Sequence, residues 1–256
     1  MERFASFDGI EIAYDVLAAG ERPVLLLHGF ASTARLNWIR PGLTAALTDA
    51  RRSVIVLDAR GHGESDAPHD QASYAGGAMV RDVISLLDHL GVREVDVAGY
   101  SMGSFVAMSL ATRDARVLSL FLGGAGTGQV RIRRPQVTAA IAEALEAEDP
   151  NTIEHPSARA FRSFADATHS DRIALAAVQR ATQPPTGEEL GRIGVPTLVV
   201  NGDRDTLIGD PTSLSDLIPG ARCLLVPGNH MSAVVRPEFR DALVAWAETG
   251  RVRRSD

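Results

Sequence analysis

Gly99-Tyr100-Ser101-Met102-Gly103 follows directly on the apolar run Val95-Asp96-Val97-Ala98 and opens a helical pattern that continues to Arg113. This is the pattern G-x-S-x-G between a strand and a helix. A nucleophilic serine on such a turn stands above the sheet, and a side chain at either flanking glycine would collide with neighbouring backbone. The free N–H groups at the start of the following helix point toward the reacting centre at this serine. The stretch therefore predicts that Ser101 is a nucleophile; the alternative is an incidental tight turn.

Short, β-rich apolar runs alternate with helical patterns along most of the chain. The predicted strands are Glu11–Leu17, Val24–Leu27, Ser53–Asp58, Val95–Ala98, Leu118–Leu122, Pro196–Asn201 and Arg222–Val226. Helical patterns run over Tyr74–Leu90, Met102–Arg113 and Pro237–Glu248. Several strands are almost continuously apolar, as expected for parallel strands buried on both faces. The alternation predicts an α/β fold with a mostly parallel central sheet and helices on both faces.

The alternation breaks between Thr127 and Arg192. This segment lacks strand signals and carries three helical patterns, near Pro135–Glu148, Ser157–Thr168 and Asp171–Ala181. Because the strand pattern resumes afterward, we expect residues 127–192 to be a helical insertion in a core domain formed by residues 1–126 and 193–256. The alternative is a separate helical domain.

The composition excludes several kinds of chemistry. All 26 basic residues of the 256-residue chain are arginines. Without lysine there is no Schiff-base lysine, no lysine general base and no Walker-type phosphate loop. The net charge of −6 gives no general attraction to nucleic acid. The single cysteine, Cys223, allows no internal disulfide, and the spacing of His, Cys and acidic residues does not suggest a metal site.

Neither a targeting segment nor a cofactor motif is visible in the sequence. The N-terminus has no apolar run long enough for a signal peptide, and the longest apolar runs are far too short to span a membrane. Gly123–Gly128 fails the dinucleotide pattern G-x-G-x-x-G, because position 129 is Gln. We therefore expect a soluble cytoplasmic protein that needs no cofactor and binds no nucleic acid and no membrane. The sequence indicates no particular oligomeric state.

A nucleophilic serine needs a base, and the base needs a carboxylate that orients it. Of the seven histidines, His230 lies in a loop after the strand Arg222–Val226, at the strand end where catalytic groups collect in parallel sheets. It also follows the serine and the candidate acids in chain order, so we predict that His230 is the general base. The preceding strand ends in Gly202-Asp203-Arg204-Asp205, which leaves Asp203 and Asp205 both open as the acid.

Two further strand ends carry polar loops. His28-Gly29-Phe30 follows the strand Val24–Leu27, where a loop N–H can face a developing oxyanion, and the N–H of Met102 would be the second donor. We expect His28 to support this loop as a buried hydrogen-bonding partner, together with Gly29. We interpret Asp58–Asp66 as a hydrogen-bonded turn that holds the same loop, rather than as a metal or acid–base site.

With these motifs in place, the whole chain resembles the α/β-hydrolase fold superfamily. The segments that carry the resemblance are His28-Gly29-Phe30, Asp58 to Ser65, Gly99-Tyr100-Ser101-Met102-Gly103, Gly202-Asp203-Arg204-Asp205 and Gly228-Asn229-His230. They are similar to the family's oxyanion motif, the turn after its fourth strand, its nucleophile elbow, its acid motif and its histidine loop. In that acid motif the last position is the triad acid, so the resemblance favours Asp205 over Asp203. It also implies that residues 127–192 are the family's helical cap.

A serine at the nucleophile position implies acyl transfer to water in this family, as in its esterases, lipases, lactonases, thioesterases and C–C hydrolases. We expect an ester hydrolase with Ser101, His230 and Asp205 as its triad and the N–H groups of Phe30 and Met102 as oxyanion donors. By family analogy, the short cap suits a small or medium ester. The residues expected to border the substrate pocket are Tyr100, Phe161, Phe164 and Met231.

Three alternatives remain open. The same machinery could open an enol-lactone or cleave a carbon–carbon bond beside a ketone. A ligand receptor on this fold could keep an intact triad and turn over slowly, and a peroxide-forming side activity is also open. For the ester hydrolase, the insertion is expected to decide which ester is used while the chemistry stays on the strand-end loops.

Overall fold

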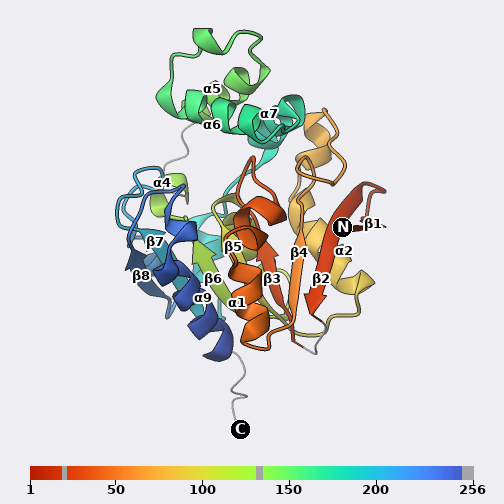
Figure 1. Cartoon of the computed structure of the whole chain (residues 1–256), viewed down its shortest axis with the longest axis vertical. Helices are drawn as coiled ribbons and strands as arrows, with labels where there is room; N and C mark the ends of the chain where they lie inside the picture. The colour runs from red at the N-terminus through yellow and green to blue at the C-terminus, as the bar shows by residue number, and fades with distance from the viewer. Residues whose placement is uncertain (19–21, 131–134, 250–256) are drawn as a thin grey trace.

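One sheet of eight strands organises the described part of the chain, which comprises residues 1–18, 22–130 and 135–249 of the computed structural model (Figure 1). The strands are β1 (Glu2–Ala5), β2 (Glu11–Ala18), β3 (Val24–Leu27), β4 (Val54–Leu57), β5 (Val95–Tyr100), β6 (Val117–Gly123), β7 (Thr197–Gly202) and β8 (Arg222–Val226). Their order in the sheet is β1-β2-β4-β3-β5-β6-β7-β8. Strand β2 runs antiparallel to both of its neighbours, whereas β4, β3 and β5 to β8 are parallel. The predicted mostly parallel α/β fold is confirmed.

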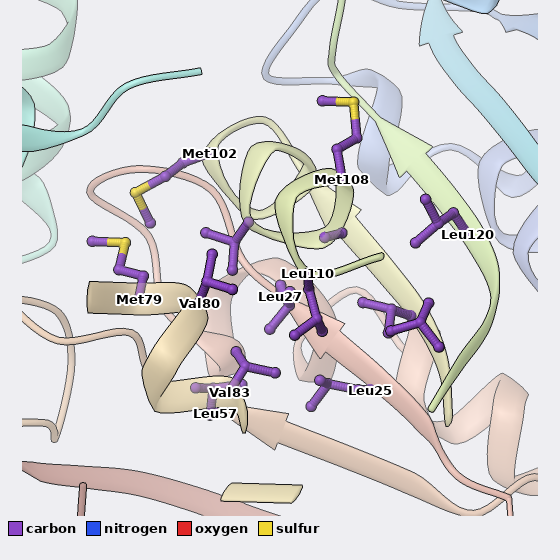
Figure 2. Close-up of a cluster of buried hydrophobic side chains, with 14 of the residues drawn as sticks. Leu25, Leu27, Leu57, Met79, Val80, Val83, Met102, Met108, Leu110 and Leu120 are labelled. Carbon is purple, nitrogen blue, oxygen red and sulfur yellow. The ribbon is translucent and has the colours of Figure 1, made fainter. Parts of the chain in front are cut away.

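Helices cover both faces of this sheet. Their bounds are α1 (Leu43–Asp49), α2 (Ala78–His89), α3 (Met102–Ala111), α4 (Thr127–Val130), α5 (Pro135–Glu146), α6 (Pro156–Ala167), α7 (Arg172–Ala181), α8 (Gly187–Gly191) and α9 (Pro237–Thr249). On one face, Val83 of α2 and Leu110 of α3 pack in the same buried cluster as Leu25 and Leu27 of β3 (Figure 2). On the other face, α1 and α9 pack against each other and against the sheet through a second apolar cluster. None of the helices in the described residues combines the length and the apolar character needed to cross a bilayer.

The strand register brings the carboxyl ends of the parallel strands to one edge of the sheet. Leu27 pairs with Gly99, and Tyr100 pairs with Gly123. Gly123 in turn pairs with Val200 of β7, and Gly202 pairs with Val226 of β8. The loops that follow these strands therefore start side by side, which is where open parallel sheets place their ligands.

The structure changes one predicted helix and adds elements that the sequence pattern did not indicate. The pattern Tyr74–Leu90 is divided into a 3₁₀ turn at Gln71–Tyr74 and the helix α2, because Gly76 and Gly77 adopt positive φ angles of 64° and 75°. A helix cannot continue through left-handed residues. Strand β1 and helix α1 were not predicted, since each is too short to show a clear period.

Helices α5, α6 and α7 form a layer above the carboxyl ends of the strands (Figure 1). We call these residues, 135–181, the helical layer. They have an apolar cluster of their own, distinct from the two clusters that cover the sheet. The short helices α4 and α8 lie at the two ends of the predicted insertion and contact the body instead, since Gly128 abuts Ile208 and Leu190 belongs to the sheet's core. Residues 131–134 of the insertion lie outside the described residues.

Candidate active site

Ser101 sits on the sharp turn between β5 and α3. Its backbone has φ 52° and ψ −114°, a conformation that is strained for a residue with a side chain, and its N–H donates to the carbonyl of Gly123 at 2.8 Å. Strain of this kind persists where the surrounding structure enforces it, and it marks candidate functional positions. A Cβ atom at Gly99 would overlap the backbone of Gly103, and one at Gly103 would overlap the carbonyl of Leu27. The predicted need for glycine at both flanking positions is therefore confirmed.

His230 lies beside this serine, on the loop that follows β8. Its Nε2 is 3.0 Å from Ser101 Oγ, and its Nδ1 is 2.7 Å from Asp205 Oδ2. The imidazole is largely buried, and its backbone carbonyl accepts a 2.6 Å hydrogen bond from the hydroxyl of Tyr100. The structure thus brings Ser101, His230 and Asp205 into one hydrogen-bonded chain.

The two aspartates of the loop after β7 have different surroundings. The Asp205 carboxylate is buried, receives the His230 Nδ1–H and accepts the N–H of Leu207 at 3.1 Å. Asp203 is half exposed, and its carboxylate accepts the N–H of Gly228 at 2.9 Å and contacts Arg204. The Gly228 N–H holds the pKa of Asp203 below its usual value. Asp203 therefore braces the histidine loop, while Asp205 contacts the imidazole itself.

The His28-Gly29-Phe30 loop lies against the serine turn. A Cβ atom on Gly29 would stand 3.5 Å from Ser101 Cβ, so the two loops are in van der Waals contact. His28 Nδ1 donates to the Gly29 carbonyl at 2.8 Å, and its Nε2 accepts the N–H of Ala59 at 2.9 Å. Burial lowers the pKa of His28, so the ring is neutral and supports the loop. No described residue accepts a hydrogen bond from the N–H of Phe30 or of Met102, which leaves both donors available.

Asn37 is a site residue that the sequence analysis missed. It lies in a short π-helix, Arg35–Ile39, and its buried Oδ1 accepts the N–H of Gly29 at 3.0 Å. Its Nδ2 has no partner among the described residues. Single π-turns are rare and often occur at functional sites. The available signal was a polar residue directly before Trp38, a large apolar residue that contributes to the core.

The Asp58–Asp66 turn supports the same loop, as its sequence suggested. Asp58 Oδ1 accepts the N–H of Ala34 at 2.8 Å, and its Oδ2 accepts the N–H of Glu64 at 2.9 Å. A Cβ atom at Gly63 would overlap this carboxylate. Within the described residues, no group of three or more His, Cys, Asp or Glu side chains could hold a metal ion.

His62, in the same turn, is fully enclosed. Its ring contacts the rings of His28 and Phe30 at centroid distances of 5.1 and 5.8 Å. Its Nδ1 lies 3.0 Å from the Arg60 carbonyl and donates to it, and its Nε2 is buried without a partner in the described structure. Burial, together with His28, lowers the pKa of His62 to about 3.

This shift predicts sensitivity to acid. An imidazole in the unfolded chain titrates near pH 6.5. Between about pH 6.5 and about pH 3 the unfolded chain therefore binds a proton at His62 that the folded chain does not. The free energy of unfolding should fall through this window as the pH is lowered, by up to about 1.4 kcal/mol per pH unit. His62→Asn can still donate to the Arg60 carbonyl but cannot titrate, so its stability should fall less steeply.

Urea unfolding of both proteins from pH 7 to pH 4.5 measures this difference. If the free energy of unfolding falls equally steeply with decreasing pH for the wild type and for His62→Asn, the prediction is contradicted.

The four predicted pocket residues have unequal positions. The Tyr100 side chain is 5% exposed and lies under the His230 loop, between His230 and Phe239, so it supports the histidine instead of bordering a pocket. This corrects the sequence expectation, which could not show that the hydroxyl is engaged. Met231 is 55% exposed beside His230. Phe161 contacts the Phe30 ring at 5.6 Å, and Phe164 packs within the apolar cluster of the helical layer.

Comparisons with known proteins agree with this architecture. The family model for the alpha/beta hydrolase fold matches residues 22–155. The chain is 27% identical, over 93% of its length and 94% of the relative, to a Bacillus subtilis (strain 168) protein with the provisional name 2-succinyl-6-hydroxy-2,4-cyclohexadiene-1-carboxylate synthase. It is 26% identical to 3-oxoadipate enol-lactonase 2 of Acinetobacter baylyi, over 92% of each chain.

A solved structure of a hydrolase from Pseudomonas aeruginosa PA01 is similar over nearly the whole chain. The TM-score is 0.77 at 28% identity, covering 96% of this chain and 97% of that one. The family match includes the serine turn and the His28-Gly29-Phe30 loop. The chain belongs to the α/β-hydrolase fold family.

Proposed function

We propose that the protein is a serine hydrolase that cleaves a small or medium carboxylic ester through an acyl-enzyme intermediate. One observation carries the proposal: Ser101 Oγ lies 3.0 Å from His230 Nε2, and His230 Nδ1 lies 2.7 Å from the buried Asp205 carboxylate. A serine hydroxyl is a weak nucleophile on its own and becomes effective when an oriented base takes its proton. Both distances are within hydrogen-bond reach, so His230 can take the serine proton while Asp205 orients the imidazole.

In the first half of the reaction, Ser101 Oγ attacks the ester carbonyl carbon while its proton moves to His230 Nε2. The carbonyl π-electrons move to the oxygen, which becomes an oxyanion held by the N–H groups of Phe30 and Met102. Asp205 keeps the proton on Nδ1, so that Nε2 is free to accept, and it stabilises the imidazolium. The carbonyl then re-forms, the C–O bond of the ester breaks, and His230 gives its proton to the leaving alkoxide.

In the second half, water replaces the alcohol. His230 Nε2 takes a proton from the water as its oxygen attacks the acyl carbon, and the same two N–H groups hold the new oxyanion. When the tetrahedral intermediate collapses, the bond to Ser101 Oγ breaks and His230 returns the proton to the serine. The acid product leaves, and the site is restored.

Enol-lactone hydrolysis is a second candidate, favoured by the similarity to 3-oxoadipate enol-lactonase 2. The steps are the same, except that the leaving enolate stays tethered to the acyl group. The partner in either case is a small molecule, since the helical layer stands over the strand ends on which the site is built (Figure 1). Initial rates on a panel of esters of increasing acyl length, lactones and enol-lactones distinguish the two.

Covalent labelling tests the proposed nucleophile. A fluorophosphonate should modify Ser101 at one equivalent and abolish ester hydrolysis in step with the labelling, because such reagents react with a serine that an adjacent base activates. Intact mass and peptide mapping measure the site and the extent of the adduct. An enzyme that keeps its ester hydrolysis with Ser101 unmodified would refute the assignment.

A further inference from the structure

Phe30, whose N–H is the proposed oxyanion donor, is held between the body and the helical layer. On one side its ring meets His62 edge to face, with centroids 5.8 Å apart at an interplanar angle of 79°. On the other side it meets Phe161 of α6, with centroids 5.6 Å apart at 69°. Edge-to-face pairs at this spacing are directional, so two of them constrain the ring more than simple burial does. The orientation of this residue therefore depends on a contact from each part of the molecule.

The next residue, Ala31, is built into the helical layer itself. It is fully buried in the layer's apolar cluster, whose other fully buried members lie between Ile141 and Ala176. It also adopts a positive φ of 56°, a backbone conformation that is unfavourable for a residue with a side chain. Such a conformation persists only when the surroundings enforce it. Seating Ala31 in the layer supplies that enforcement.

The first half of the same loop is secured by the body alone. His28 bonds to Ala59, and Gly29 bonds to Asn37, all within the sheet domain. Up to Gly29 the loop is therefore anchored by the body alone, whereas Phe30 and Ala31 also contact the helical layer before Ala34 bonds back to Asp58 in the body. The peptide between Gly29 and Phe30, which carries the donor N–H, lies where the two sets of anchors meet.

We propose that Phe161 is a positioning residue for the oxyanion site: it holds Phe30 against His62 and so directs the Phe30 N–H toward the carbonyl on Ser101. This rests on the proposed function. It also revises the sequence expectation that the insertion selects substrates without affecting the chemistry. The contact from the helical layer thereby completes the oxyanion site.

The test compares Phe161→Ala with a variant that loses packing in the same cluster and leaves the pair of rings Phe30–Phe161 intact. Ile153→Ala serves as that control, because Ile153 is buried in the cluster and lies outside α6. Loss of one oxyanion donor costs about 10²–10³ in kcat, and a misdirected donor loses part of that, so Phe161→Ala should lower kcat by about tenfold or more. KM should change much less. Ile153→Ala should retain kcat, and Phe161→Tyr, which keeps the ring, should recover most of it.

An inhibitor series gives a second readout that loss of packing alone would not move. A trifluoromethyl ketone forms a tetrahedral oxyanion on Ser101, whereas the carboxylic acid product does not. Phe161→Ala should raise the inhibition constant of the ketone by the same factor by which kcat falls. The inhibition constant of the acid product should stay nearly unchanged. In a Phe30→Ala background, which keeps the N–H and removes the ring, Phe161→Ala should have almost no further effect.

The outcomes separate the two proposals. A wild type that hydrolyses no ester or lactone and resists fluorophosphonate would overturn the proposed function. An active, labelled wild type in which Phe161→Ala and Ile153→Ala lose kcat equally would overturn only this inference. Additive losses from Phe161→Ala and Phe30→Ala would also overturn it, because Phe161 would then act by a route other than Phe30.

Discussion

Replacing Ser101 by alanine is expected to lower kcat for ester hydrolysis by about 10⁶-fold, the loss typical of removing the nucleophile from a serine triad. The reason is geometric: Ser101 Oγ is the group that His230 Nε2 contacts at 3.0 Å, and alanine leaves no atom there to form the acyl-enzyme. His230→Ala should lower kcat by about the same factor. The double variant should lower kcat no further than either single variant, because the two residues act as one unit. Steady-state kinetics on the best ester of the panel measures all three.

Ser109→Ala is the matched control for this experiment. Ser109 also lies on α3, is 9% exposed and makes no hydrogen bond to the proposed triad among the described residues. Ser109→Ala makes the same substitution on the same helix, and it should leave kcat unchanged. Substantial hydrolysis by purified Ser101→Ala, with contamination excluded by mass, would mean that another group carries the reaction.

Asp205→Asn is expected to lower kcat by about 10⁴-fold. An amide at this position can donate to Nδ1, which favours the tautomer whose proton sits on Nε2, and that nitrogen can then no longer accept the serine proton. The same change at Asp203 should cost far less, since Asp203 bonds the backbone of Gly228 and does not touch the imidazole. The two residues lie on one loop, two positions apart, so each serves as the other's control.

The dependence of kcat/KM on pH distinguishes loss of the triad acid from a general disruption of the loop. Asp205→Asn should change this dependence, because the Asp205 carboxylate lies 2.7 Å from Nδ1 of the proposed general base. Asp203→Asn should keep the profile of the wild type. If Asp203→Asn shows the large loss and the altered profile while Asp205→Asn does not, the acid is Asp203.

Much of the fold was predictable because parallel strands buried on both faces leave a strong local signal. Runs such as Val24–Leu27 are apolar throughout, and the structure buries all four residues. The serine turn was equally predictable, since Gly99-Tyr100-Ser101-Met102-Gly103 between a strand and a helix is a local pattern, although the contact that requires Gly103 comes from Leu27 on another strand. The break in the pattern at Tyr74–Leu90 was harder to place, because a glycine pair leaves the apolar period intact while its positive φ angles end the helix.

The candidate site was predictable in part. Chain order and strand ends were sufficient to name Ser101 and His230, but the residues alone left Asp203 and Asp205 open, and only the resemblance to a family favoured one. The structure separates them by burial and by which carboxylate reaches the imidazole. Asn37 was missed because its role depends on a hydrogen bond to Gly29, which no periodicity records.

The sequence by itself determined the elements whose physics is local: buried strands, the strained serine turn, and the order of nucleophile, acid and base along the chain. Tertiary structure decided what depends on contacts between distant segments. Tyr100 supports His230 across 130 positions of sequence, and Phe161 closes on Phe30 from another layer. Such contacts arise from how whole elements pack. The periodicity of apolar residues along one helix or strand shows which face is buried, but it does not show which distant side chain will contact that face.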